Sequence, residues 1–457
     1  MKGLGKHRWK FLLPLLIFLP AVVFGQDASA AAPAPAINTG DTAWVMTSAV
    51  LVLLMTIPAL ALFYGGMVRK KNVLATIYYS LSAAVIVSIL WVVGQYSLIF
   101  GVTSADAAKE SGILAFIGDL KYAFMNGIDI NSVHPNAVTI PEYVYSMFQL
   151  MFAIITVALI SGAVVERMSF IGWFVFTILW SLVVYTPLAH WVWNPEGWLW
   201  HLGALDFAGG LVVHTSSGVT ALVLIKLLGP RKSFRKEPVS PPANIGYIFI
   251  GAALLWVGWF GFNAGSAVAA NGIAGSAFFV TNTAAAMAAL VWMILEWIMH
   301  KKPTVVGAST GAVAGLVAIT PASGFVGVGS ALLIGAVVSI ISFTFMTVFR
   351  KMFKYDDALD VFSVHGLGGI WGAIATGIFA NGLVYNNVKG LAFGGGFSQV
   401  GIQLLSVLAA VGIAVIGTII CYFLTQLITL GKIRASEQSE VSGLDISQHG
   451  EQLESDN

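Results

Sequence analysis

Two histidines, His214 and His365, lie within apolar stretches long enough to cross a lipid bilayer. Ionisable side chains are costly at that depth, so they usually face a protein interior or a solute pathway. A neutral imidazole carries one hydrogen-bond donor and one acceptor, so two facing rings could line a path for a small solute or relay protons. Two alternatives remain open: core histidines satisfied locally, and axial ligands of a haem. No other haem cue is present, and we expect no cofactor.

Further candidate residues lie near the ends of apolar runs. Asp206 begins one run, where a carboxylate can cap a helix N-terminus. Phe148 and Phe152 are four residues apart and therefore share one helix face. Trp193, Trp259 and Phe262 fall where aromatic side chains are usually interfacial belt residues. Such rings could instead form a cage for a cation.

The composition indicates a membrane protein. Of the 457 residues, 58% are hydrophobic and only 10% are charged, and the mean hydropathy is +0.86. Soluble domains contain about 25% charged residues. The net charge of +2 gives no indication of a nucleic-acid partner, and the single Cys421 excludes an intrachain disulfide.

The apolar runs predict an all-α polytopic membrane protein with eleven transmembrane helices. Each run is close to the roughly 20 residues that a spanning helix needs, and helices satisfy their own backbone groups in lipid. The 49 glycines suit close helix packing. The predicted spans are about 42–67, 75–100, 142–165, 170–190, 206–228, 244–264, 274–299, 304–320, 327–349, 361–380 and 400–430.

Lysine and arginine concentrate in alternate connections, which predicts the orientation of the chain. Under the positive-inside rule these connections are cytoplasmic, so the mature N-terminus lies outside and the C-terminus in the cytoplasm. We therefore expect an external loop over 101–141 and a solvated cytoplasmic linker over 229–243. The basic clusters are Arg69-Lys70-Lys71, Arg167, Arg231 to Lys236, Lys301-Lys302 and Arg350 to Lys354.

The first thirty residues have the pattern of a signal peptide. A basic start precedes the apolar segment Phe11 to Phe24, and Ala28-Ser29-Ala30 is typical of a cleavage site. The alternative is a retained first transmembrane helix. We predict a signal peptide over 1–30, a membrane domain over 40–430 and a cytoplasmic tail over 431–457.

The two histidine-bearing spans suggest an internal repeat. Asp206 precedes His214 in the fifth span, and Asp360 precedes His365 in the tenth. Because five spans separate them, the two halves would be inverted, leaving a C-terminal helix outside the repeat. Transporters of this design place their site where the repeats meet.

Several segments resemble the Amt/Mep/Rh ammonium transporters, specifically the bacterial Amt branch. The resemblance covers the chain from about residue 40 to the tail. It is carried by Gly203-Ala204-Leu205-Asp206-Phe207-Ala208-Gly209-Gly210-Leu211-Val212-Val213-His214, by Trp259 to Ser266, and by Asp356 to Gly366.

The resemblance implies a role for each candidate residue. Phe148, Trp193 and Ser266 would form an outer site that recruits ammonium, and Asp206 would order that site without touching the ion. Phe152 and Phe262 would be stacked gate rings beneath it. The pore residues would be His214, His365 and Trp259. The family fold, eleven helices with two inverted five-helix halves, is assembled as a trimer with one pore per subunit.

The implied function is ammonium transport rather than enzymatic catalysis. Ammonium resembles potassium in size and charge, but only ammonium donates hydrogen bonds and can lose a proton. A cage for the cation followed by an apolar lumen for neutral ammonia would exclude potassium by its desolvation cost. Whether a proton returns with the ammonia stays open. The alternative is a membrane ammonium sensor with little transport.

The tail resembles the cytoplasmic C-terminal motif of bacterial Amt proteins. The matching segment runs from Glu440 to Glu451. In the family this motif packs across subunits and takes part in regulation by a PII-type signal protein at the cytoplasmic exit. The family's tyrosine after the last glutamate is missing here, where Gln452 and Leu453 follow instead. A solvated polar tail is the alternative.

Overall fold

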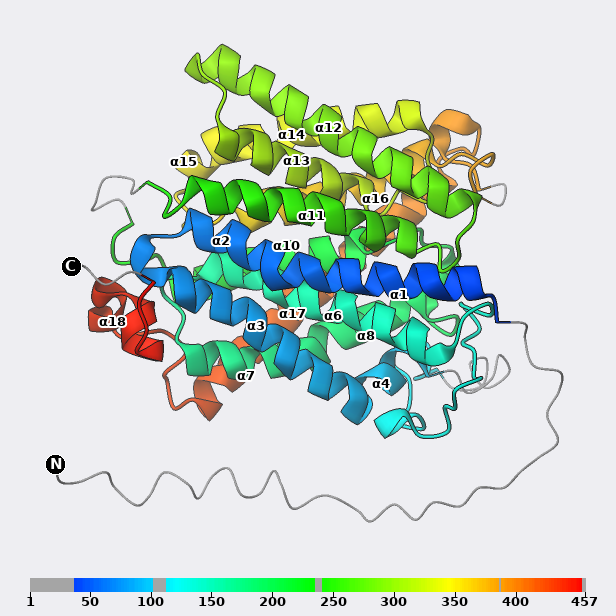
Figure 1. The fold of residues 1–457 in the computed structure, drawn as a ribbon, viewed down its shortest axis with the longest axis horizontal. Coiled ribbons are helices and arrows are strands. Elements are labelled where there is room, and N and C mark those ends of the chain that lie inside the picture. Colours follow the sequence, from blue (N-terminus) through cyan, green and yellow to red (C-terminus); the bar gives the residue numbers. More distant parts are fainter. Residues whose placement is uncertain (1–36, 102–111, 235–240, 386–387, 454–457) are drawn as a thin grey trace. The chain divides into compact units, whose positions relative to one another are not determined.

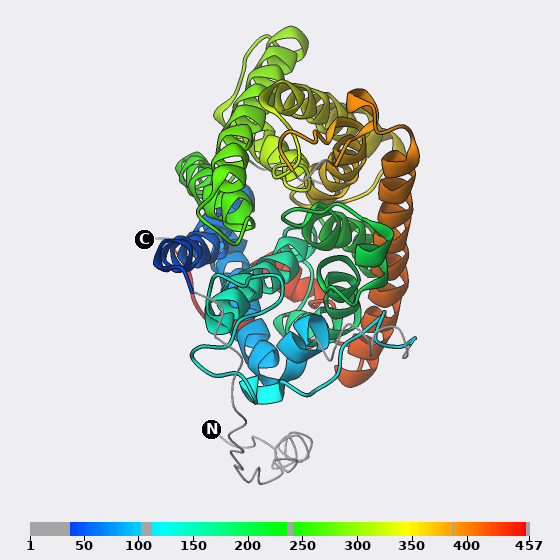
Figure 2. The ribbon, with the colours of Figure 1, turned by 90° about the vertical axis from the view of Figure 1, so that its right-hand side faces the viewer.

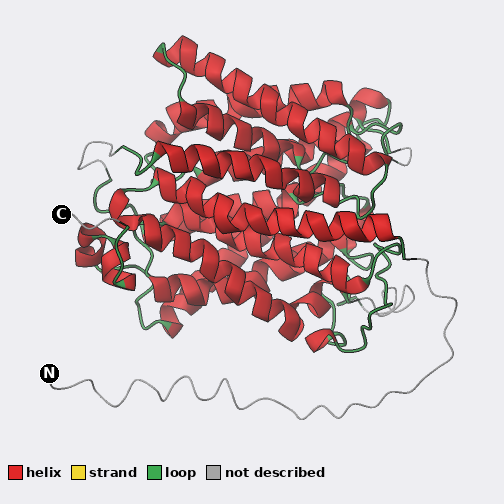
Figure 3. Cartoon of the chain, in the orientation of Figure 1, coloured by secondary structure: helices red, strands yellow, loops and turns green. Residues whose placement is uncertain are grey.

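The computed structural model describes residues 37–101, 112–234, 241–385 and 388–453, so the predicted signal peptide lies outside the described residues. Within these ranges the chain is helical (Figure 1, Figure 3), and its only extended pairing is an isolated bridge between Met168 and Arg434. The α-helices are α1 (Thr39–Leu54), α2 (Ala61–Met67), α3 (Val73–Leu90), α4 (Tyr96–Phe100), α6 (Glu142–Val164), α7 (Phe170–Trp180), α8 (Thr186–Trp193), α9 (Trp198–Leu202), α10 (Ser216–Leu228), α11 (Ile245–Gly265), α12 (Gly272–His300), α13 (Val305–Ile319), α14 (Val328–Thr344), α15 (Arg350–Phe353), α16 (Leu367–Phe379), α17 (Ser398–Ile428) and α18 (Glu437–Ser442).

The chain is a multi-pass membrane protein. Ten helical segments of the described residues are long and apolar enough to cross a membrane, and α13 is a shorter apolar helix. Together they account for the eleven predicted spans. The ten segments are Thr39–Met67, Lys70–Phe100, Glu142–Val164, Phe170–Leu202, Gly210–Leu228, Ile245–Gly265, Gly272–His300, Val328–Phe349, Phe362–Phe379 and Ser398–Ile428.

The helix bundle has two ends that differ in chemistry. Figure 1 shows α18 at the left end, whereas α4, α8 and the start of α1 lie toward the right end. We call the left end the tail face; it carries the predicted cytoplasmic connections and the C-terminal segment. We call the right end the cavity face; it carries Trp193, Asp206 and Ser266.

The two histidine-bearing segments cross in a reciprocal way. Each begins with a wide π-helical turn, η7 (Gly210–Thr215) or η9 (Phe362–Gly366). Glycines allow the crossing: a Cβ on Gly218 of α10 would lie 2.1 Å from the backbone nitrogen of Gly366 in η9. A Cβ on Gly369 of α16 would lie 2.6 Å from the carbonyl oxygen of Gly210 in η7. The η9 turn thus packs on α10, the helix that follows η7. The η7 turn packs on α16, the helix that follows η9, as expected for two related halves. Figure 2 views the bundle from the cavity face.

The structure changes which aspartate corresponds to Asp206. Asp357, not Asp360, lies eight residues before His365, as Asp206 lies eight residues before His214. The Asp357 carboxylate accepts the backbone N–H of Phe362 at 2.8 Å, just as Asp206 accepts backbone N–H groups. Asp360 instead pairs with Arg350 at 2.8 Å. The predicted match between Asp206 and Asp360 is therefore wrong by three residues, since Asp360 lies only five residues before His365.

Gly218→Ala is expected to prevent folding or membrane accumulation, because the added Cβ would collide with backbone atoms of Gly366 that cannot rotate away. Overpacking of this kind usually costs about 1–3 kcal/mol, and more where backbone must move. The measurement is the yield of monodisperse protein on size exclusion. Gly412→Ala in α17 is the matched control, since its Cβ would meet nothing within 4 Å. Normal yield of both variants would contradict the crossing.

A network of buried charges joins the loops at the tail face. Arg231 pairs with Glu166 at 2.7 Å and with Asp356 at 2.7 Å, and Arg69 also reaches Glu166 at 3.1 Å. Burial raises the pKa of Glu166, but Arg231 and Arg69 outweigh that effect and the net shift is downward. The prediction of a solvated linker over 229–243 is wrong for Arg231, whose side chain is only 17% exposed. The sequence could not reveal its partners, which come from distant connections.

Candidate functional site

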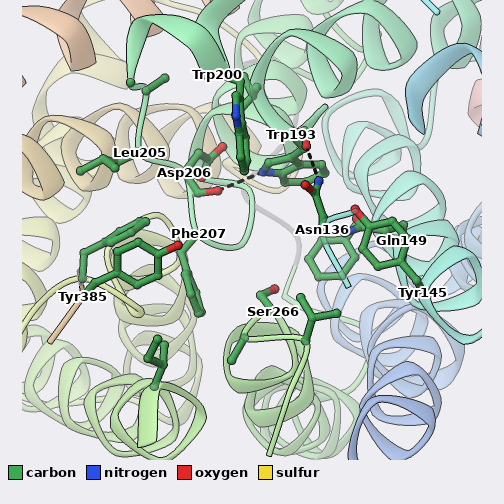
Figure 4. Close-up of a pocket in the computed structure, with 18 residues that line it drawn as sticks. Asn136, Tyr145, Gln149, Trp193, Trp200, Leu205, Asp206, Phe207, Ser266 and Tyr385 are labelled. Atoms are coloured by element: carbon green, nitrogen blue, oxygen red, sulfur yellow. Dashed lines mark hydrogen bonds between the residues drawn. The ribbon is translucent and has the colours of Figure 1, made fainter. Parts of the chain in front are cut away.

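A cavity of about 460 Å³ opens at the cavity face of the bundle. Trp193, Asp206, Ser266 and Phe152, four of the residues predicted from the sequence, lie on its wall. Figure 4 shows Ser266 and Trp193 facing the same space, with Asp206 beside the Trp193 ring. The remaining lining residues are Asn136, Tyr145, Gln149, Val192, Trp200, Gly203, Ala204, Leu205, Phe207, Ala267, Val268, Ile273, Phe325 and Tyr385.

Asp206 holds the turn that begins the fifth span. Its two carboxylate oxygens accept four successive backbone N–H groups at 2.5 to 3.1 Å, those of Gly209, Gly210, Leu211 and Val212. The chain can enter this turn because Gly209 has a φ of +110°, a conformation that glycine adopts without strain. Burial raises the pKa of Asp206 to about 6, and the four donors oppose that rise. The carboxylate is thus committed to the backbone, consistent with a helix cap.

Two hydrogen bonds hold Trp193 in place, one from its indole and one to its backbone carbonyl. Its indole N–H donates to the carbonyl oxygen of Asp206 at 3.0 Å. Its own carbonyl oxygen accepts from the side-chain amide of Asn136 at 2.9 Å. The indole therefore has a fixed position at the cavity, and its N–H is not available to a ligand.

Ser266 contributes an acceptor to the cavity. Its hydroxyl donates to the carbonyl oxygen of Phe262 at 2.8 Å, so its lone pairs remain the groups that a ligand would meet. A cation that donates hydrogen bonds suits this arrangement, whereas an anion does not.

Two phenyl rings separate the cavity from the interior. Phe152 and Phe262 have ring centroids 4.4 Å apart, and both rings are buried. Phe152 also contacts the Trp193 ring at 5.8 Å. Phe148 does not line the cavity. It packs against Phe152 at 5.0 Å, on the same helix face as predicted.

Behind the phenyl rings lie the two histidines. His214 is 6.1 Å from Phe262 and 5.3 Å from His365, measured between ring centroids. The two Nδ1 atoms are 3.2 Å apart, so one ring donates to the other. Both rings are buried, and His214 Nε2 has no hydrogen-bond partner within the described residues. Since one Nδ1 carries the shared proton, the pair presents one protonated and one unprotonated Nε2.

Trp259 supports this pair from the side. Its ring lies 5.5 Å from His214 at an interplanar angle of 19°, and its indole N–H donates to Thr320 Oγ1 at 2.8 Å. Trp259 also contacts Phe262 at 5.5 Å. The indole thus touches both the phenyl pair and the histidine pair, and Thr320 sets its orientation.

Thr320→Val is expected to destabilise the protein by about 1–3 kcal/mol, because the substitution keeps the shape of the side chain but leaves the buried Trp259 N–H without an acceptor. The measurement is the thermal unfolding midpoint in detergent. Thr320→Ser, which retains the hydroxyl, should behave more like the natural protein. Equal midpoints for the natural protein and the valine variant would show that this hydrogen bond contributes nothing.

Several residues at the cavity were missed from the sequence. Asn136 lies in the loop before α6, Phe207 and Tyr385 lie in other connections, and Trp200 lies in the short helix α9. Loop residues carry no periodic signal that would bring them together. Gln149 could have been suspected, because it shares a helical face with Phe152 at a spacing of three residues. In the described part of the chain, no group of three or more His, Cys, Asp or Glu residues could hold a metal ion.

Comparison with known proteins identifies relatives along nearly the whole chain. Residues 43–454 match the Ammonium Transporter Family. An ammonium transporter of Bacillus subtilis (strain 168) is 46% identical over 417 residues, which cover 91% of this chain and 99% of that protein.

Solved structures show the same architecture. The crystal structure of Saccharomyces cerevisiae Mep2 is 34% identical and superimposes with a TM-score of 0.79, covering 88% of this chain and 91% of that one. A protein described as a sensor Amt protein has a TM-score of 0.79 at 28% identity, covering 90% of this chain and 98% of its own.

Proposed function

The chain belongs to the ammonium transporter family, and from this premise we propose that its cavity, phenyl pair and histidine pair form a path for ammonium transport. The observation that carries the proposal is the continuous order of these groups. Ring contacts of 5.8, 4.4, 6.1 and 5.3 Å lead from Trp193 through Phe152, Phe262 and His214 to His365.

Ammonium is recruited in the cavity beside Trp193 and Ser266. The Trp193 ring attracts the cation through its quadrupole, and the Ser266 hydroxyl accepts a hydrogen bond from it. Asp206 acts by holding Trp193 and the η7 turn in place. Phe148 contributes through Phe152, the ring against which it packs.

Ammonium gives up a proton to solvent water in the open cavity before it passes Phe152 and Phe262 as ammonia. A buried, apolar passage penalises a cation far more than a neutral molecule, so ammonia crosses where potassium does not. Beyond the rings, the histidine pair offers ammonia one donor and one acceptor at the two Nε2 atoms. These partners replace part of the hydration that ammonia loses. The histidine pair could also carry the proton that ammonium released. The net transported species is then either ammonia alone or ammonia together with a proton.

Uptake of labelled methylammonium by cells that lack their own ammonium transporters tests the proposed transport directly. Cells that express this chain should accumulate the label, and excess ammonium should compete with it. Absence of accumulation despite normal amounts of membrane-inserted protein would contradict transport.

Sensing with little transport is the second candidate function, and the similarity to a sensor Amt protein favours considering it. A sensor would bind ammonium in the same cavity but show little flux. The uptake measurement therefore separates the two functions, since binding to purified protein without uptake by cells would favour sensing.

The C-terminal segment supports a proposal about regulation. Asp445 accepts the backbone N–H groups of Leu74 at 3.1 Å and Ala75 at 2.8 Å, at the start of α3. Glu440 accepts from the Arg434 side chain at 2.7 Å and from the backbone of Lys232 at 3.0 Å. The tail thus packs against the start of α3 and the loop that contains Lys232. In our proposal these segments surround the cytoplasmic exit of the path. We propose that a PII-type protein binds this face and occludes the pore.

Full-length protein in membranes is expected to retain a PII-type protein, and truncation after Leu430 is expected to reduce retention at least tenfold, because the docking contacts of the tail are lost. Pull-down under several effector conditions measures this. Asp445→Ala is the milder variant, since it removes only the contact with α3. Failure of the full-length chain to retain the PII-type protein under every condition would contradict the regulatory proposal.

We further propose a homotrimer in a bacterial plasma membrane. Large apolar side chains are exposed on α11, α12 and α14, including Phe249 (58%), Phe279 (60%) and Leu333 (53%), as subunit contacts or lipid would require. The basic residues of the tail face support a cytoplasmic C-terminus and an external N-terminus. The proposed domains remain a signal peptide over 1–30, the membrane domain over 40–430 and the regulatory tail over 431–457.

A further inference from the structure

The cavity is much larger than its proposed substrate. A water molecule, which is close to ammonium in size, takes up about 30 Å³ in the liquid. The cavity measures about 460 Å³, which lies in the range of small-molecule sites, roughly 300–1,000 Å³. Recruitment of a single ammonium ion by Trp193 and Ser266 leaves most of this space unexplained.

The unexplained space has an aromatic wall of its own. Phe207 contacts Phe325 at 5.6 Å, and Phe325 contacts Tyr385 at 4.9 Å, forming a row that we call the aromatic row. Figure 4 shows Tyr385 and Phe207 on the opposite side of the cavity from Gln149 and Tyr145, with Trp200 above them.

The aromatic row is anchored by backbone hydrogen bonds. The N–H of Phe207 donates to Pro321 at 3.1 Å, and the carbonyl oxygen of Phe325 accepts from Asn381 at 2.8 Å. Three separate connections are thereby tied together beside the cavity. The row is therefore a fixed part of the wall.

The charges around the cavity favour a cation. None of the described residues that line it is a lysine, arginine or histidine, and Asp206 is its one acidic lining residue. Both sides of the cavity are aromatic, with Trp193 on one and the aromatic row on the other. Rings arranged around a space that lacks positive charge are the typical environment for quaternary ammonium groups, which offer no hydrogen-bond donor.

We propose that the cavity binds quaternary ammonium cations between Trp193, Trp200 and the aromatic row, and that these cations block the path without crossing it. This inference extends the proposed function by naming a second ligand class for the same cavity. A tetraalkylated nitrogen cannot lose a proton or donate to Ser266. The Phe152 and Phe262 rings are in contact, with centroids 4.4 Å apart, and a tetraalkylated nitrogen would need a much larger opening between them than ammonia would. Such a cation would therefore occupy the cavity and compete with ammonium.

Calorimetric titration of the purified full-length protein with tetramethylammonium chloride tests the proposal. We expect saturable binding to the natural protein. We expect about tenfold weaker binding to a Trp200→Leu/Tyr385→Leu variant, which loses two rings but keeps apolar bulk. The matched control is Trp200→Phe/Tyr385→Phe, which keeps both rings and should bind nearly as well as the natural protein. tert-Butanol, a neutral probe of similar size, should bind much more weakly.

Three results would overturn the proposal: no saturable binding, equal affinity in the leucine variant and the natural protein, or equal affinity for tert-butanol. Uptake of labelled tetramethylammonium into proteoliposomes would overturn the blocking step. Because the titration does not depend on transport, a chain that binds this cation but carries no ammonium would contradict only the proposed function. A chain that carries ammonium but does not bind tetramethylammonium would contradict only this inference.

Discussion

Replacing both His214 and His365 with alanine is expected to lower ammonium flux about 100-fold while the protein still folds and inserts. The two rings are the polar groups that face each other beneath the phenyl pair, with Nδ1 atoms 3.2 Å apart. Removing two hydrogen-bond partners worth about 1.5 kcal/mol each raises the barrier for ammonia by about 3 kcal/mol, which corresponds to the expected slowing. Flux into proteoliposomes, normalised to inserted protein, measures the effect.

His201→Ala is the control for this double variant, because His201 is exposed on α9 and lies outside the path. It should transport like the natural protein. Unchanged ammonium flux together with unchanged potassium exclusion in the double variant would contradict the proposed role of the histidine pair.

Asp206→Ala is expected to abolish transport, with a loss of at least 100-fold. The carboxylate accepts four buried backbone N–H groups, and each donor left without a partner costs about 1–3 kcal/mol. The η7 turn that carries His214 would then lose its shape, and the backbone carbonyl of residue 206, which accepts from the Trp193 indole, would be displaced with it. Uptake of labelled methylammonium measures the loss.

The Asp206→Asn variant keeps the shape of the side chain but removes its negative charge. One amide oxygen can still accept from two of the four N–H groups, whereas the amide nitrogen would face the other two. We therefore expect partial transport, between the alanine variant and the natural protein. If the alanine variant transported as well as the natural protein, Asp206 would be a dispensable helix cap.

Hydropathy predicted the spans well because lipid imposes a strong and simple constraint on sequence. The sixth predicted span, 244–264, differs from α11 by only one residue at each end. One misplacement at the site concerns the fifth span. Its helix begins at Gly210 rather than at 206, since Asp206 and the left-handed Gly209 form the turn that precedes it. Such a cap is a matter of side-chain geometry, which hydropathy does not report.

The path itself was predictable to the extent that its residues lie in long sequence motifs. His214, His365 and Phe262 are such residues, whereas Phe152 was singled out by its spacing from Phe148; the structure brings the four rings together. The aromatic row was not predictable, because Phe207, Phe325 and Tyr385 come from three connections with no common period. Arg231 was misjudged for the same reason, since its buried partners Glu166 and Asp356 are far away in sequence.

The most direct test of the proposed path compares ammonium with potassium in proteoliposomes that contain the purified natural protein. We expect an imposed ammonium gradient to drive flux that rises with protein content, and an equal potassium gradient to drive none above empty liposomes. This result follows if an apolar passage behind the Phe152 and Phe262 rings admits ammonia and rejects a cation that cannot lose a proton. Potassium flux comparable with ammonium flux would contradict the account.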